Sequence, residues 1–115
     1  MKIKIKGTGE VRSLEYLVQR HDEDIPQDFS AEYALADPDI RMNSDGEYET
    51  SSETYEWWRN LFTCMERCDD MEKKVGVTEA KIILEEVGFD FDRDPEGSYS
   101  RYESALKKYI EEMDK

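Results

Sequence analysis

The segment 88–103, GFDFDRDPEGSYSRYE, contains the residue types of a calcium-binding loop. Three alternating aspartates are followed by a glycine and a glutamate, and these five residues are Asp90, Asp92, Asp94, Gly97 and Glu103. An EF-hand loop requires glycine at position 6 and a bidentate glutamate at position 12. Pro95 and Arg101 occupy those positions, so only a two-residue insertion restores the spacing.

The same carboxylates also suit the N-terminus of a helix. Ser100 to Glu103, SRYE, has the pattern of a capping box, which gives Glu103 a competing role. The three aspartates would face the positive end of the helix dipole. We therefore predict an ordinary loop with no metal and no cofactor, and a calcium-binding helix–loop–helix at 88–103 is the alternative.

Other chemistry has little support in the sequence. Cys64 and Cys68 are one helical turn apart, but they could hold a metal only with further ligands, and the single histidine, His21, is distant in the chain. Reduced thiols packed on a helix face are the preferred interpretation. The chain has no nucleophile elbow, P-loop or glycine-rich dinucleotide turn. We predict that the protein is not an enzyme.

Acidity is the strongest global property of the 115-residue chain, whose net charge is −13. Residues 22–56 contain twelve acidic side chains against Arg41 alone, whereas residues 1–21 are net basic. Such a distribution argues against direct binding to nucleic acid or anionic membranes, and it favours a basic protein partner. With no apolar segment of signal-peptide or membrane-span length, a cytoplasmic protein is expected.

The N-terminal half has the patterns of short strands. Residues 1–7, MKIKIKG, alternate apolar residues with lysines and predict a strand, with the lysines possible at a sheet edge. Residues 39–50 predict a hairpin around the turn NSDG. Apolar spacings of three and four over residues 10–21 favour a short helix, although a strand stays open, and Ser30 could cap a second short helix.

The C-terminal half has the patterns of helices. The longest should run from about Ser51 to Lys74, after a capping box at Thr50–Glu53 and before Gly76. Its buried stripe is expected to contain Tyr55, Trp58, Leu61, Phe62, Met65, Cys68 and Glu72. Thr78 should cap the next helix, and the last should run from about Arg101 to Met113.

Together these elements predict an α+β fold in a single domain, residues 1–115. A small antiparallel sheet, made of the N-terminal strand and the hairpin near 39–50, should pack against the mainly helical C-terminal half.

The acidic third of the chain is interleaved with aromatic residues, which suggests a binding surface. Its carboxylates could reproduce part of the charge array of nucleic acid, and the aromatic side chains would supply anchors. The candidate partner-binding residues are Asp37, Asp39, Asp45, Glu47, Tyr48, Glu49, Glu53, Glu56 and Trp57.

In size, acidity and mixed α/β pattern, the chain resembles the small inhibitors that phages and mobile elements use against host defence. These include anti-CRISPR and anti-restriction proteins, several of which mimic DNA. The resemblance implies that the protein occupies the basic groove of a nuclease or CRISPR effector in the host cytoplasm. It is a resemblance to a class, so it assigns no functional residue.

Three other interpretations remain open. The protein could be an immunity protein or antitoxin that neutralises a basic toxin. Its acidity could serve only solubility. The wide apolar arc of the longest helix, with Trp57 further round it, also leaves a homodimer open.

Overall fold

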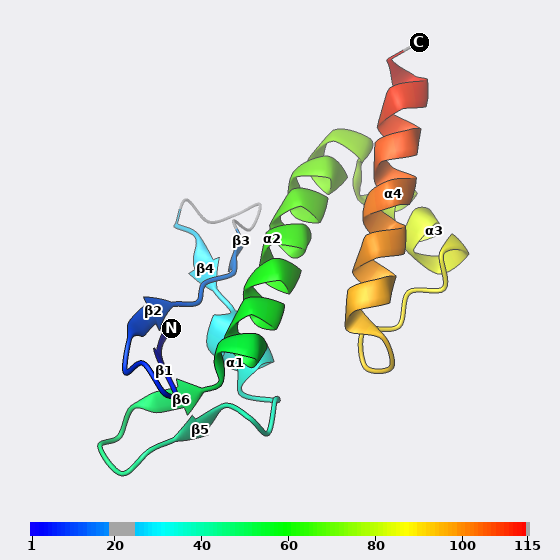
Figure 1. Ribbon diagram of the computed structural model, residues 1–115. Coiled ribbons are helices and arrows are strands. Elements are labelled where there is room, and N and C mark those ends of the chain that lie inside the picture. The colour runs from blue at the N-terminus through cyan, green and yellow to red at the C-terminus, as the bar shows by residue number, and fades with distance from the viewer. Residues whose placement is uncertain (19–24, 115) are drawn as a thin grey trace. The chain divides into compact units, whose positions relative to one another are not determined.

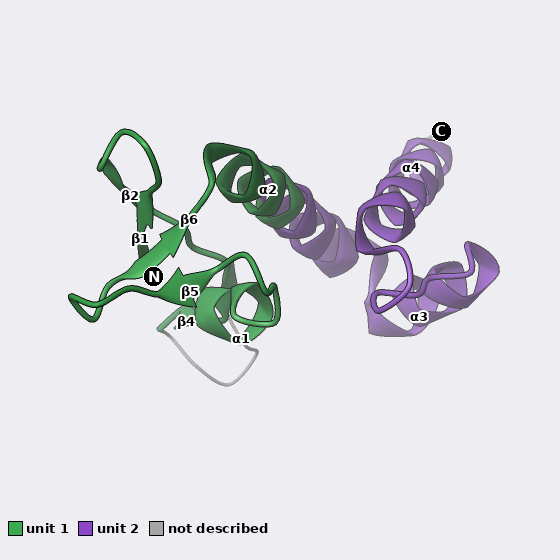
Figure 2. Ribbon diagram, turned by 60° about the horizontal axis from the view of Figure 1, so that its bottom comes forward, with its two compact units in different colours: residues 1–62 green, residues 63–115 purple. Residues whose placement is uncertain are grey.

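The protein is α+β in a computed structural model that describes residues 1–18 and 25–114, as the sequence predicts (Figure 1). Short strands occupy the N-terminal part and helices the C-terminal half. The chain forms two compact units, residues 1–62 (unit 1) and residues 63–115 (unit 2), shown in Figure 2. The long helix α2, Ser52–Val75, begins in unit 1 and ends in unit 2.

Unit 1 contains a four-stranded sheet in the order β2 (Val11–Ser13), β1 (Lys2–Ile5), β6 (Tyr48–Thr50) and β5 (Arg41–Met42). The predicted hairpin is confirmed, since β5 and β6 pair in antiparallel fashion. The suggested edge position of the N-terminal strand is wrong, because β1 lies between two other strands. β1 pairs with β6 in parallel, a pairing between segments far apart in the chain.

Residues 11–13 and 17–18 are strands and no helix forms between them, so the short helix predicted over residues 10–21 is wrong for its described part. β2 pairs with β1, and β3 (Leu17–Val18) pairs with β4 (Gln27–Asp28). Leu14 and Tyr16 are buried and Glu15 between them is exposed, which is the period of a strand. His21, at the end of the predicted helix, lies outside the described residues.

Several helices begin at other residues than the sequence predicts, and the predicted capping residues do not cap them. Helix α1, Ser30–Ala34, follows Phe29, and the buried Ser30 hydroxyl accepts a hydrogen bond from the Tyr16 amide at 2.7 Å instead of capping. At the start of α2, Ser51 replaces the predicted Thr50, since its Oγ accepts from the Thr54 amide at 3.2 Å.

The two later helices also begin at other residues than predicted. Helix α3, Val77–Glu86, follows Gly76, whose φ of +98° suits glycine. Thr78 lies inside the helix and does not cap it. Helix α4, Pro95–Met113, begins well before Arg101, because the Asp94 side chain accepts from the Gly97 amide at 3.1 Å and Pro95 opens the first turn.

The core of unit 1 is rich in aromatic rings. Phe62 stacks on Tyr16 with ring centroids 5.6 Å apart, and the Trp58 ring lies 5.5 Å from it at a tilt. The Tyr33 ring meets Phe62 edge-on. The Tyr55 hydroxyl donates to the carbonyl of Ser13 at 2.8 Å, which ties α2 to the end of β2. This part of the predicted stripe on α2 is confirmed.

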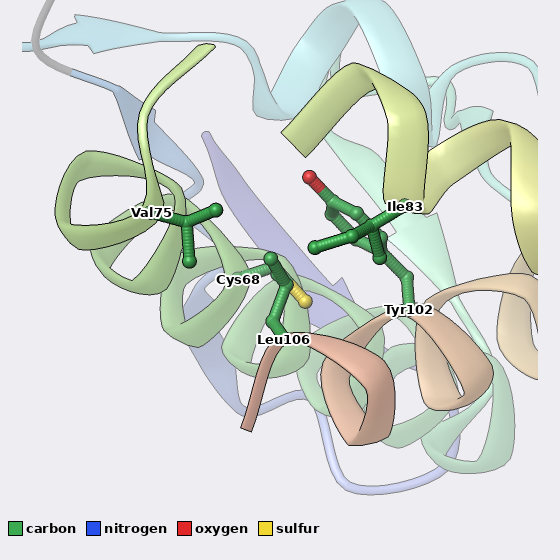
Figure 3. Packing of buried hydrophobic residues seen from close by; sticks show 5 residues of the cluster. All are labelled: Cys68, Val75, Ile83, Tyr102 and Leu106. Carbon is green, nitrogen blue, oxygen red and sulfur yellow. The ribbon is translucent and has the colours of Figure 1, made fainter. Parts of the chain in front are cut away.

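The core of unit 2 is formed by the second half of α2 together with α3 and α4. Its buried residues are Cys68, Val75, Ile83, Tyr102 and Leu106 (Figure 3). Glu72 is predicted on the buried stripe of α2, and it accepts a hydrogen bond there from the hydroxyl of the buried Tyr102 at 2.6 Å. An acid on an apolar stripe is thus explained by a buried donor that needs an acceptor.

We expect Phe62→Ala to lower the free energy of unfolding of the protein by about 3–5 kcal/mol, because it removes a buried ring that contacts three others. Trp57→Ala should have a clearly smaller effect, since Trp57 is only half-buried against Trp58. Urea unfolding followed by circular dichroism measures both changes. A larger loss for Trp57→Ala than for Phe62→Ala would contradict this account of the core.

Candidate acidic surface and thiol–carboxylate cluster

Two of the predicted partner-binding acids, Asp37 and Asp39, act inside the fold. Asp37 accepts from Trp58 Nε1 at 2.9 Å. Asp39 Oδ2 accepts from the hydroxyl of the fully buried Thr50 at 2.8 Å and from the hydroxyl of Ser51 at 2.9 Å. Hydrogen bonds from Thr54, Thr50 and Ser51 hold the pKa of Asp39 well below its usual range. Both carboxylates join the β5 region to the start of α2, so their partner-binding role is not favoured.

Three further acids have cationic neighbours within unit 1. Glu47 lies 3.9 Å from Lys4 Nζ, and Glu56 accepts from Arg12 at 3.2 Å. Glu49 stands opposite Lys4 on β1 and opposite Arg41 on β5, and opposite charges at such positions stabilise a sheet modestly. Basic residues of the N-terminal segment, residues 1–21, therefore lie beside part of the acidic segment, residues 22–56, and partly neutralise its negative charge.

Asp45 and Glu53 are the predicted acids most open to a partner. Both are exposed, and in the described part of the chain no hydrogen bond or ion pair involves either carboxylate. Asp45 lies in the turn of the β5–β6 hairpin, and Glu53 lies in the first turn of α2. Glu53, Glu56 and Trp57 follow at spacings of three and four, so they share one face of α2.

The hairpin also presents an apolar pair. Met42 on β5 stands opposite Tyr48 on β6, and 59% of the Met42 surface is exposed. β5 is the last strand of its sheet, so the strand leaves one edge without a neighbour among the described strands. The hairpin therefore combines acidic side chains with apolar surface that the fold leaves uncovered.

The segment 88–103 does not have the geometry of the calcium alternative. Residues 95–103 are α-helical, so they cannot curve around an ion as an EF-hand loop does. Asp90 Oδ1 accepts from the Arg93 amide at 3.1 Å, and Asp94 caps α4 and lies 3.5 Å from Arg101. Glu103 turns instead toward α2. Only residues 88–94 form a loop, because α4 already begins at Pro95. The capping role assigned to Ser100 and Glu103 is wrong for the same reason.

Glu103 lies beside the two cysteines in unit 2, a cluster that sequence spacing did not bring together. Cys64 Sγ lies 3.2 Å from Glu103 Oε2, and the ligand atoms of Cys64, Cys68 and Glu103 all lie within 4.8 Å of one another. Arg67 Nε donates to the same carboxylate at 3.0 Å, and Lys107 Nζ at 3.2 Å. In the sequence only the thiol pair gave a signal, since Glu103 is 35 residues beyond Cys68.

The surroundings of the cluster shift its titrations. Burial raises the pKa of both thiols, and the charge of Glu103 adds to the effect. Partial burial would also raise the pKa of Glu103, but hydrogen bonds from Cys64, Arg67 and Lys107 outweigh it, so this pKa lies below its ordinary value. The cluster thus consists of two protonated thiols beside an ionised carboxylate at neutral pH.

Comparisons with protein families, with curated proteins and with solved structures give no match to this chain. Within residues 1–18 and 25–114, none of the helices combines the length and the apolar character of a membrane span.

We expect Asp39→Asn to reduce the loss of stability in acid. A carboxylate with a lowered folded-state pKa stabilises the fold above its unfolded pKa, here near the ordinary value of 3.8, and this contribution disappears as the pH falls below that value. Urea unfolding between about pH 2 and 6, a range that brackets an ordinary carboxyl pKa, measures this effect. The free energy of unfolding should fall less steeply with decreasing pH for the variant than for the wild type. Asp45→Asn, which removes an exposed carboxylate, should keep the wild-type slope, and equal slopes for all three proteins would contradict the role of Asp39.

We expect millimolar Ca²⁺ to leave the melting temperature nearly unchanged. A ligand at a hundredfold excess over its Kd would stabilise the folded state by about 2.7 kcal/mol, which is several degrees for a protein of this size. A rise of that size in calorimetry, abolished by Asp92→Asn, would restore the calcium alternative.

Proposed function

We propose that this protein is an acidic inhibitor that binds a basic, nucleic-acid-binding partner and occupies its nucleic-acid groove, in the manner of anti-CRISPR and anti-restriction proteins. The observation that carries the proposal is the β5–β6 hairpin, where the carboxylates of Asp45 and Glu47 and the side chain of Met42 are all exposed. Carboxylates there would attract a basic groove, and the apolar pair of Met42 and Tyr48 would be buried on contact.

The charge density of the hairpin indicates how such binding would work. Acids at every second position of an extended chain are about 6.8 Å apart, whereas one DNA strand carries a phosphate per roughly 3.4 Å of axis. Lys4 and Arg41 beside Glu49 reduce the density further. Charge would therefore mainly speed and orient the encounter, and apolar contact would decide how long the complex lasts.

An immunity-type function is the second candidate, and the same apolar pair favours it. A surface that relies on Met42 and Tyr48 selects a partner by shape, which suits one cognate toxin better than many DNA-binding proteins. The two candidate functions differ in the number of partners and in whether the protein competes with nucleic acid. A mimic displaces nucleic acid from its target, while an immunity protein neutralises a single partner at any site on it.

Charge reversal at two matched places tests the proposal. Asp45→Lys with Glu47→Lys changes the hairpin, and Glu111→Lys with Glu112→Lys changes exposed positions on α4 by the same net charge. Glu49 is left intact because it stands opposite two cations within the sheet, Lys4 and Arg41, whereas Glu47 has only Lys4 beside it. We expect the hairpin variant to bind its partner at least about tenfold more slowly at low salt, with a smaller difference at high salt.

The assay is DNA binding by a broad panel of nucleases and CRISPR effectors, with and without the protein, at two salt concentrations. Loss of inhibition confined to the hairpin variant, with circular dichroism unchanged, supports the mimic. Neutralisation of a single nuclease without competition against DNA would support the immunity function instead. If no member of the panel is inhibited, or if both variants behave alike, the proposed function is wrong.

A further inference from the structure

The thiol–carboxylate cluster of unit 2 brings together three metal-ligand groups from two helices. Cys64 and Cys68 lie on successive turns of α2, and Glu103 reaches them from α4. Their ligand atoms lie within 4.8 Å of one another. Ligand atoms of a tetrahedral zinc site are separated by about 3.3–3.8 Å, given bonds of about 2.0–2.3 Å. Small side-chain movements would close that difference.

We propose that Cys64, Cys68 and Glu103 form a zinc site, with water as the fourth ligand. Two sulfur ligands and one carboxylate suit Zn²⁺, which accepts both types in tetrahedral geometry. Ca²⁺ and Mg²⁺ prefer sets of oxygen ligands, so the two thiols argue against them. This site is independent of the proposed function, because the hairpin lies in unit 1 and contributes no ligand.

The charges around the cluster suit a bound zinc ion. Two thiolates and one carboxylate carry three negative charges, and Zn²⁺ together with Arg67 and Lys107, which both donate to Glu103, carries four positive charges. Arg67 already donates to Glu103 at 3.0 Å, so it is in place to orient the carboxylate as an outer partner of the site. Binding releases one proton from each thiol to the solvent, which makes the affinity fall as the pH falls.

The same surroundings disfavour a nucleophilic role for the cysteines. A reactive cysteine has a lowered pKa, whereas burial raises the pKa of both thiols here. Cys68 is also almost fully buried, with 1% of its surface exposed, so an external substrate would not reach it easily. The raised pKa does not prevent metal binding, because a bound metal ion stabilises the thiolates directly.

A cobalt titration of the full chain under metal-free reducing conditions tests the site. We expect one Co²⁺ per chain, a thiolate-to-cobalt charge-transfer band, the release of two protons per metal, and loss of the band when Zn²⁺ is added. Zn²⁺ should also raise the melting temperature, because the site joins α2 to α4 only in the folded state.

Variants separate ligands from bystanders. Cys64→Ser should abolish the charge-transfer band or shift it strongly, and Glu103→Gln should weaken Co²⁺ binding by more than about tenfold, since even changes outside the ligand set cost that much. Glu112→Gln, the same chemical change at an exposed position of α4, should leave binding intact. Cys68 belongs to the core, so the result for Cys68→Ala is used only if circular dichroism shows that this variant is folded. If it is not folded, the test rests on Cys64→Ser, because Cys64 is only half-buried. Absence of the band in the wild type, or equal binding by the wild type, Cys64→Ser and Glu103→Gln, would overturn the proposal.

Discussion

Burial of apolar side chains of helix α2 is the constraint on which both units depend. Tyr55, Trp58 and Phe62 fill the core of unit 1, and Cys68 and Val75, further along the helix, lie in the core of unit 2. The strands of unit 1 are only two to four residues long, and such short ladders gain little stability from their own hydrogen bonds. They persist because their buried side chains pack in the core to which α2 contributes its aromatic rings.

Three of the acidic side chains serve as acceptors for donors that the fold buries. Asp37 accepts from Trp58, Asp39 from Thr50, and Glu72 from Tyr102. A buried donor without an acceptor costs about 1–3 kcal/mol, so each carboxylate removes a specific penalty. Part of the acidity therefore belongs to the interior architecture, and only the remainder, which includes Asp45 and Glu53, is available to a partner.

The hairpin and the thiol–carboxylate cluster depend on different ranges of the chain. The hairpin is local: Asn43 Oδ1 accepts from the amides of Asp45 and Glu47, which holds the turn with neighbouring residues. The cluster is long-range, because Glu103 meets Cys64 only after α3 and the loop after it have returned the chain against α2. The hairpin can therefore be predicted from the sequence, whereas the thiol–carboxylate cluster depends on how the helices pack.

The sequence by itself determined the α+β class, the extent of α2, its buried face and the hairpin at residues 39–50. These follow from turn chemistry and from apolar periodicity that is sustained along a long helix, which the short pattern over residues 10–21 lacked. Tertiary structure decided that β1 is an inner strand, that residues 11–13 and 17–18 are strands, and that α4 begins at Pro95. It also gave Asp37, Asp39 and Glu103 their partners. The physical reason is that a strand's neighbour and a carboxylate's donor come from distant parts of the chain, and packing of the cores selects them among many chemically equivalent alternatives.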